Sequence, residues 1–304
     1  MDIRHLKYFC AVAEELHFSR AAERLNIATP TLSDQIRALE NHLGVMLLHR
    51  STKRKVEMTF AGRQFYPRAK DLIQSFENAE LYAKKTARGE IGNVRVGYVL
   101  NAVTGGYILK AIELARAATP EITIDIRRTQ TLSQIKAITN GELDVGFMRH
   151  LEAYPSGIDS IKVGRQHLGI ALHRDNPLAS YERIPPSALT DQKFVSYTLD
   201  AEFGFWRNVA AVLPAGHTPH IVQRVPDAFS VFVLVSAKVG IAVLPYSFKS
   251  LAYDPIVMRE ISGAPKFADN SFVFRASEDS PAVRSFIETV RKGFSETSIA
   301  CLKP

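Results

Sequence analysis

Cysteines and long apolar runs are scarce in this sequence of 304 residues. No apolar run approaches the roughly 20 residues that a transmembrane helix needs, and residues 1–15 lack a signal-peptide core, so we expect no membrane partner and no export. The two cysteines, Cys10 and Cys301, stand near opposite ends, without the spacing of a metal site or a disulfide framework. We therefore expect a cytoplasmic protein without a metal site, and with Cys10 as a small core residue.

Motifs that are typical of catalysis and cofactor binding are missing as well. The sequence has no G-x-S-x-G elbow, no Walker loop, no G-x-G-x-x-G after a strand and no H-E-x-x-H. Its nine histidines are scattered, and His217 and His220 are more typical of a loop pair than of a metal site. We predict a protein that is not an enzyme and has no cofactor. The alternative is a small-molecule-binding or enzymatic α/β protein whose basic N-terminal head binds DNA without specificity.

The composition is that of an ordinary globular protein with a positive balance of charge. Hydrophobic residues make up 46% of the chain, charged residues make up 23%, and the net charge is +7. The length predicts two or three structural units. The positive charge weakly favours a polyanionic partner, and its distribution along the chain carries more information than its total.

Residues 18–44 predict two short helices joined by a tight turn. The spacing i, i+3, i+4, i+7 gives the first helix an apolar face of Phe18, Ala21, Ala22 and Leu25. Thr29 is expected to cap the second helix, Pro30 suits its first turn, and Gly44 ends it. The predicted buried face of the second helix consists of Leu32, Ile36, Leu39 and Leu43. This is the helix-turn-helix arrangement, whose second helix enters the DNA major groove, although an αα-hairpin in any small bundle would share the spacing.

Polar side chains at the start of the second helix are candidates for reading base edges. Among them, Asp34 can accept from a cytosine amine, or can instead pair with Arg37 or Arg63. The basic segment 49–62 alternates like a β-hairpin around residues 53–54, which is typical of a wing that contacts phosphates, although a basic run alone is often only a solvated turn. The predicted DNA-binding residues are Arg20, Thr29, Pro30, Thr31, Ser33, Asp34, Gln35, Arg37, Arg50, Lys53, Arg54 and Lys55.

The stretch 63–88 predicts a long linker helix with an apolar seam. The seam residues are separated by alternating steps of four and three, as in a heptad repeat. This pattern favours dimerisation through a coiled coil, and the alternative is packing against the helix's own domain. The predicted dimerisation residues are Phe65, Ala69, Leu72, Phe76, Ala79 and Ala83.

Five short motifs follow one another in the first seventy residues: L-x-x-F (Leu6, Phe9), F-S-x-A-A-x-x-L (Phe18 to Leu25), L-S-x-Q-I-x-x-L-E-x-x-L-G (Leu32 to Gly44), L-x-x-R (Leu47, Arg50) and T-x-A-G (Thr59 to Gly62). With these motifs, the first seventy residues resemble the N-terminal domain of LysR-type transcriptional regulators. Two positions depart from the family pattern: Thr29 stands where glutamine is frequent, and Asp34 where a basic residue is common. The resemblance implies double-stranded promoter DNA with a pseudo-palindromic site, RNA polymerase and further copies of the chain, as a dimer of dimers, as partners.

From residue 89 onward, short strands alternate with helices, one of them expected over 104–117, and this predicts parallel α/β sheets. The chain is expected to cross near 163–164 into a second α/β unit, whose first strand is predicted over 167–173, and to return near 267–268, with hinge geometry. Segments 141–149 and 239–245 resemble the regulatory domain of the same family. We expect a winged helix-turn-helix domain (1–62), a linker helix (63–88) and two Rossmann-like subdomains (92–163 with 268–297, and 164–267), similar to periplasmic binding proteins.

Ligands of open α/β sheets bind beyond the carboxyl ends of the strands, so we place an effector there. Arg149 can bind a carboxylate or form an ion pair with Glu152, and the phenylalanines of 203–205 can line the cleft or pack in a core. In the family branch that controls aromatic-compound degradation, residues matching Thr131 and Arg149 contact acidic effectors. The resemblance thus implies a small organic acid. The predicted effector-binding residues are Val99, Leu100, Asn101, Ala102, Thr131, Arg149, Phe203 and Phe205.

Overall fold

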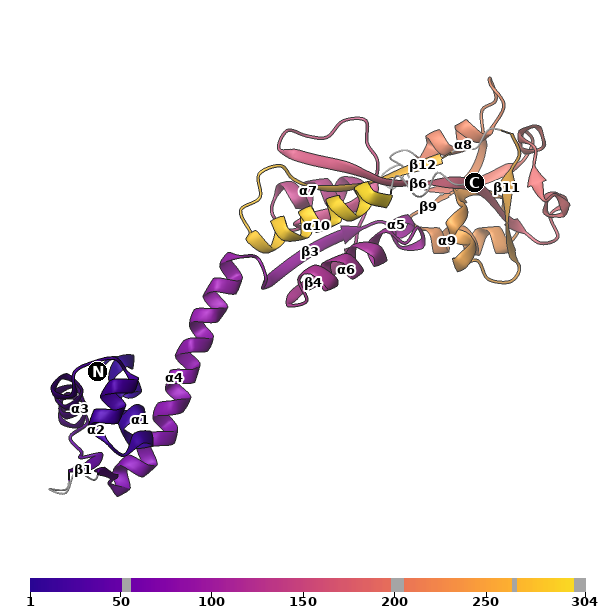
Figure 1. The fold of residues 1–304 in the computed structure, drawn as a ribbon. Helices are drawn as coiled ribbons and strands as arrows, with labels where there is room; N and C mark the ends of the chain where they lie inside the picture. Colours follow the sequence, from indigo (N-terminus) through magenta and orange to yellow (C-terminus); the bar gives the residue numbers. More distant parts are fainter. Residues whose placement is uncertain (51–55, 198–204, 264–266, 298–304) are drawn as a thin grey trace. The chain divides into compact units, whose positions relative to one another are not determined.

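The computed structural model describes residues 1–50, 56–197, 205–263 and 267–297 (Figure 1). The chain forms two compact units, which divide between Lys85 and Thr86. Within the described ranges, no helix is both long enough and apolar enough to cross a membrane.

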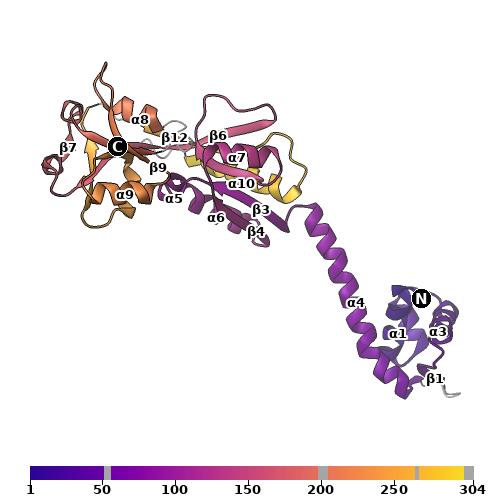
Figure 2. The same ribbon diagram turned by 180° about the vertical axis from the view of Figure 1, so that it is seen from behind.

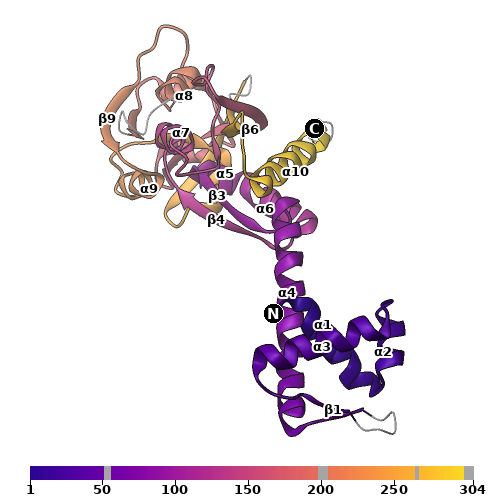
Figure 3. The same ribbon diagram turned by 90° about the vertical axis from the view of Figure 1, so that its left-hand side faces the viewer.

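The first unit is a small helical bundle with a two-stranded hairpin. Figure 3 shows α1, α2 and α3 gathered beside the N-terminal part of α4. Its core contains the apolar faces that were predicted for α2 and α3. Most of their residues are at most 2% exposed: Ala21, Ala22, Leu32, Ile36 and Leu39. The elements are α1 (Ile3–Glu15), α2 (Phe18–Arg24), α3 (Thr29–Leu43), β1 (Leu48–Arg50), β2 (Val56–Met58) and α4 (Phe60–Ala87).

The expected cap of α3 is wrong, whereas its expected end is confirmed. Thr29 is already the first helical residue. The N-cap position belongs to Ala28, whose side chain has no oxygen that could accept a hydrogen bond from the first N–H groups of the helix. Pro30 is compatible with this earlier start, because the N–H groups of the first helical turn have no intrahelical partner and its missing N–H therefore costs no hydrogen bond at the second helical position. At the other end, Gly44 adopts a left-handed conformation with φ +68° and terminates the helix.

The seam of α4 divides into a buried part and an exposed part. Ala69 is fully buried in the core of the first unit, and the Phe65 ring lies 5.5 Å from the Phe9 ring. These two residues therefore pack against their own domain. Farther along, Leu72 and Phe76 are 50% and 43% exposed, and Ala79 and Ala83 are exposed as well. The helix also begins three residues earlier than predicted, at Phe60.

The second unit contains an eight-stranded sheet and a separate pair of strands. The strand order is β4-β3-β5-β12-β6-β11-β7, with β10 also paired to β6, and β8 pairs with β9. The pairs β3–β4, β3–β5 and β8–β9 are parallel, as predicted, whereas β12 runs antiparallel to both β5 and β6. The elements are β3 (Gly92–Tyr98), α5 (Leu100–Thr104), α6 (Tyr107–Ala118), β4 (Ile122–Arg128), α7 (Thr131–Thr139), β5 (Val145–Arg149), β6 (Ile158–His173), η1 (Pro177–Ser180), β7 (Arg183–Ile184), η2 (Pro186–Leu189), β8 (Lys193–Tyr197), α8 (Phe205–Val212), β9 (His220–Val225), α9 (Ala228–Ser236), β10 (Ala242–Pro245), η4 (Tyr246–Leu251), β11 (Ile256–Ile261), β12 (Phe267–Arg275) and α10 (Pro281–Thr297).

This second unit has two halves joined by two long strands. Half I contains β3–β5, α5–α7 and α10; one core lies between the sheet and α6 with α10, and another lies under α7 (Figures 1 and 2). Half II contains β7–β11, α8, α9 and η4, again with a core on each face of its strands. The paired strands β6 and β12 pass through both halves. The positions at which the crossings were predicted lie within β6 (163–164) and at the start of β12 (267–268), and β6 is much longer than the predicted strand over 167–173.

Candidate DNA-reading helix and effector pocket

The outer face of α3 presents the polar side chains that were predicted to read DNA. Thr31, Asp34 and Arg37 are exposed, while Ser33 and Gln35 are half-buried. Asp34 Oδ1 lies 3.5 Å from Arg37 Nη1, so the acidic group is partly neutralised by its own helix. Such an exposed pair is weak, and both groups remain available to DNA.

The hairpin after α3 has the expected antiparallel pairing, with Arg50 opposite Val56. Lys53, Arg54 and Lys55 lie outside the described residues, and of Arg50 only the backbone is described. On α2, the predicted phosphate contact Arg20 is exposed and donates from Nη2 to the Glu15 carbonyl at 2.6 Å.

A buried carboxylate that the sequence analysis did not single out holds the hairpin against α3. Glu40 is 3% exposed, and its Oε1 accepts from the backbone N–H groups of Leu47 and Leu48 at 2.8 and 3.1 Å. The Thr59 hydroxyl donates to the Met46 carbonyl at 2.7 Å on the same loop. Glu40 was visible only as one letter of a family motif. Its role depends on where the chain turns after Gly44.

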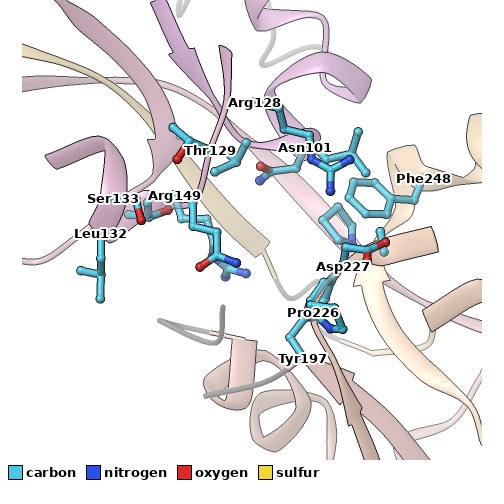
Figure 4. Close-up of a pocket in the computed structure, with 16 residues that line it drawn as sticks. Asn101, Arg128, Thr129, Leu132, Ser133, Arg149, Tyr197, Pro226, Asp227 and Phe248 are labelled. Carbon is cyan, nitrogen blue, oxygen red and sulfur yellow. The ribbon is translucent and has the colours of Figure 1, made fainter. Parts of the chain in front are cut away.

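Half I and half II line a cavity of about 450 Å³ that is open to solvent on one side (Figure 4). It lies where the carboxyl ends of β3, β4 and β5 face those of β8, β9 and β10, which is the edge predicted from the sheet topology. Of the predicted effector residues, Val99, Leu100, Asn101, Thr131 and Arg149 line it.

Two other parts of the effector prediction fare differently. Ala102 is wrong as a lining residue, because α5 turns its side chain into the core of half I, where it is fully buried. Phe203 lies outside the described residues, and Phe205 begins α8 with only its backbone described. Arg128, Tyr197, Pro226, Asp227 and Phe248 line the cavity without having been predicted.

Arg149 is a half-buried cation that lines the cavity. Its guanidinium points into the space between Ser133 and Tyr197 (Figure 4), and Nη2 donates to Asn208 Oδ1 of α8 at 3.1 Å. Burial lowers the pKa of Arg149 to about 10, so the group stays charged at neutral pH. A partly desolvated guanidinium favours a bidentate carboxylate, because the attraction is weakly screened there.

Two helix N-termini face the cavity from opposite halves. In half I, Thr131 and Ser133 of α7 line it, and the N-cap residue Gln130 makes no side-chain cap bond. In half II, Asp227 caps α9, with Oδ1 accepting from Phe229 N at 2.9 Å and Ser230 N at 3.1 Å. Burial acts against ionisation, but these hydrogen bonds lower the pKa of Asp227. The α9 terminus is thus neutralised internally, and the side formed by α7 and Arg149 is positive.

A helix-turn-helix unit followed by a two-halved α/β unit with a polar cavity defines a class of ligand-responsive DNA-binding regulators. Residues 3–63 match the family model for bacterial regulatory helix-turn-helix proteins of the lysR family, and residues 87–295 match the LysR substrate binding domain. The chain belongs to the LysR family of DNA-binding transcriptional regulators. The predicted family and fold class are thereby confirmed.

Full-length relatives agree with this assignment. The chain is 34% identical over 297 residues to the Hca operon transcriptional activator HcaR of Escherichia coli, covering 96% of this chain and 98% of the relative. The crystal structure of CbnR, a LysR family transcriptional regulator, has a TM-score of 0.84 at 28% identity, covering 96% of this chain and 100% of that one. CbnR complexed with target DNA has a TM-score of 0.82 at 27% identity, covering 97% and 100%. These relatives are regulators, so the protein is not an enzyme, and the enzymatic alternative is wrong.

Proposed function

We propose that this regulator binds a pseudo-palindromic promoter site and that a small organic acid in the cavity controls this binding. The observation that carries the proposal is the combination, in one cavity, of a cationic group with aromatic and apolar side chains. Arg149 and the α7 N-terminus offer a carboxylate site, while Tyr197, Pro226 and Phe248 can contact an apolar body. The volume of about 450 Å³ is in the range of small-ligand sites.

For the DNA-binding part, we assign residues 1–62 to the DNA-binding domain and 63–88 to the linker. Thr31, Ser33, Gln35 and Arg37 would contact base edges, and Arg20 with the basic residues of the hairpin would contact phosphates. The exposed apolar part of the seam on α4 supports pairing with a second copy of the chain, and the family resemblance supports a dimer of dimers that meets RNA polymerase. Two paired heads then contact two half-sites.

For the regulatory part, we assign 92–163 with 268–297 to one subdomain and 164–267 to the other. The acid contacts both halves of the cavity, so it binds one arrangement of the halves more tightly than another. The linker helices of paired copies carry this change to the spacing of the DNA-binding heads. The cytoplasm, where the promoter DNA is, is the expected site of action.

Benzoate, an aromatic ring with one carboxylate, is a suitable probe of the cavity. Replacing Arg149 by Gln removes the charge while keeping most of the length, and we expect benzoate to bind between about tenfold and a hundredfold more weakly. Trp206 is the one tryptophan of the chain and stands two residues before Asn208, the partner of Arg149. Its fluorescence in the full-length protein therefore provides the titration signal.

Two further variants make the result specific. Arg149→Lys keeps a cation but loses the planar fork, so it should restore binding only in part. Arg291→Gln removes an exposed arginine of α10 that lies 3.6 Å from Asp159, and benzoate affinity should be unchanged. Equal benzoate affinity in the wild type and Arg149→Gln would contradict the proposed carboxylate site.

A further inference from the structure

A chain of short hydrogen bonds connects the wall of the cavity with the strands that cross between the halves. Asn101, which lines the cavity from α5, is 6% exposed and donates from Nδ2 to Asn270 Oδ1 on β12 at 2.7 Å. The backbone carbonyl of the same Asn101 accepts from Gln166 Nε2 on β6 at 2.7 Å. Both crossing strands therefore hold one residue of the cavity wall.

The chain continues into half II and returns to α5. Gln166 Oε1 accepts from the Ser247 hydroxyl of η4 at 2.8 Å, and Ser247 Oγ lies 2.9 Å from the Thr104 hydroxyl at the end of α5. We call Asn101, Thr104, Gln166, Ser247 and Asn270 the hinge relay. Its members come from half I, from both crossing strands and from half II.

The relay lies where the crossing strands are irregular. The register of β12 against β6 shifts between Asn270 and Ser271, where Asn270 is opposite Gly164 and Ala268 is opposite Gln166. A register shift of this kind interrupts the ladder and increases the local twist, so it is a natural place for the halves to rotate. The two buried carboxamides of the crossing strands, Gln166 at 6% and Asn270 at 1% exposed, both lie on the half II side of this shift, and Asn270 is directly next to it.

The lack of a side chain at Gly105 leaves room for the Gln166 carboxamide. A Cβ atom on Gly105 would lie 1.9 Å from Gln166 Nε2, so a larger residue there would displace the carboxamide from the Asn101 carbonyl. Because a buried carboxamide that loses its partners is costly, a rotation of the halves must either carry α5 with it or break the relay. The position of Asn101 is therefore tied to the angle between the halves.

We infer that Gln166 and Asn270 are positioning residues that couple occupation of the cavity to the angle between the two halves, through Asn101. This inference rests on the proposed effector cavity and adds the path by which its occupation is transmitted. An acid that engages the Asn101 side chain competes with Asn270 for it, and the relay then shifts at the crossing strands. Removing Gln166 leaves the cavity lining intact and takes away the bonds from β6 to the Asn101 carbonyl and to Ser247, so that of the relay only the Thr104–Ser247 contact still joins α5 to η4.

The first test needs no ligand. Gln166→Met in the full-length protein keeps the size of the side chain and removes its hydrogen bonds, and hydrogen exchange of α5 and η4 should become about tenfold faster. Ser271→Ala is the matched control, because it removes a 2.9 Å bond to His150 from a fully buried residue of the other crossing strand, β12, outside the relay. Faster exchange confined to β12 is expected there. Identical exchange patterns in the two variants, or no change in Gln166→Met, would overturn the inference.

The second test uses benzoate and separates binding from response. Benzoate affinity of Gln166→Met should stay within about threefold of the wild type, while the benzoate-induced change in DNA affinity should fall at least about tenfold. Ser247→Ala should likewise keep the benzoate affinity and weaken the benzoate-induced change in DNA affinity. Ser247→Thr keeps the hydroxyl and should therefore keep the wild-type response. A full response in Gln166→Met contradicts the relay. A wild type that does not bind benzoate contradicts the proposed function for this acid, and the exchange result still decides on the relay.

Discussion

Asp144 lies buried in half I, inside the segment 141–149 that resembles the family. Its Oδ2 accepts from the Arg95 backbone N–H at 2.8 Å, and its Oδ1 lies 2.6 Å from Arg95 Nη2 and 3.1 Å from Arg275 Nη2. Burial acts to raise the pKa of Asp144, but the hydrogen bonds from Arg95 and Arg275 outweigh it and lower the pKa. One carboxylate thus joins β3, β5 and β12.

Replacing Asp144 by Asn should lower the free energy of unfolding at pH 7 by about 2–3 kcal/mol, below the value for a fully buried pair because the arginines are partly exposed. Since folding lowers the pKa of Asp144, its stabilisation is present above the ordinary value of 3.8 and is lost as the pH falls below it. Urea unfolding at pH 7 and pH 3 measures both. Asp159→Asn, in an exposed pair with Arg291, should cost at most about 0.5 kcal/mol. A difference between the wild type and Asp144→Asn that is the same at both pH values would contradict this account.

Among single residues, those that line the cavity from half I were predicted better from the sequence than those that line it from half II. Asn101, Thr131 and Arg149 follow predicted parallel strands, and the carboxyl ends of such strands meet at one edge. Tyr197 and Asp227 were missed, although they too follow strands, because their place in the cavity depends on how half II packs onto half I. The spacing of residues in the sequence carries no information about that packing.

The secondary-structure elements, too, were predicted only in part. The helix predicted over 104–117 corresponds to α6, which begins at Tyr107 after Gly106 at φ +76°, whereas the short helix α5 before it was not predicted. A helix of five residues is too short to show an apolar period, and α5 is what brings Asn101 to the cavity. Strand β6 was predicted at less than half its length, because residues 158–165, most of them half-buried, do not alternate strictly between apolar and polar side chains.

Helix α3 and the hairpin should make different contributions to DNA binding. Gln35→Ala should cost about 1–3 kcal/mol on the preferred site and relax discrimination at one base position, because a carboxamide can read a base edge. Arg54→Ala should weaken binding about equally on all sequences and reduce the slope of affinity against salt. Binding of both variants to the preferred site and to base-substituted sites at several salt concentrations tests this. If the two variants behave alike, the division between base reading and phosphate contact is wrong.

At the scale of the whole molecule, the chain combines a DNA-binding unit with an effector-binding unit. The helix-turn-helix motifs indicated the first unit directly, because its helices are short and their contacts are local in sequence. The second unit was predicted as a class, from alternating strands and helices, while its crossing strands bring residues 101 and 270 together. Function in such a chain depends on contacts between residues that lie far apart in the sequence.

The central claim is that this chain is a sequence-specific regulator, and a footprint of the full-length protein tests it most directly. The DNA probe is the region upstream of the protein's own gene and of the neighbouring gene that is transcribed in the opposite direction. The footprint is measured at two salt concentrations. The account predicts protection of an extended, pseudo-palindromic site that persists at the higher salt concentration. Diffuse protection that disappears at the higher salt concentration would contradict it, because binding would then come from phosphate contacts alone.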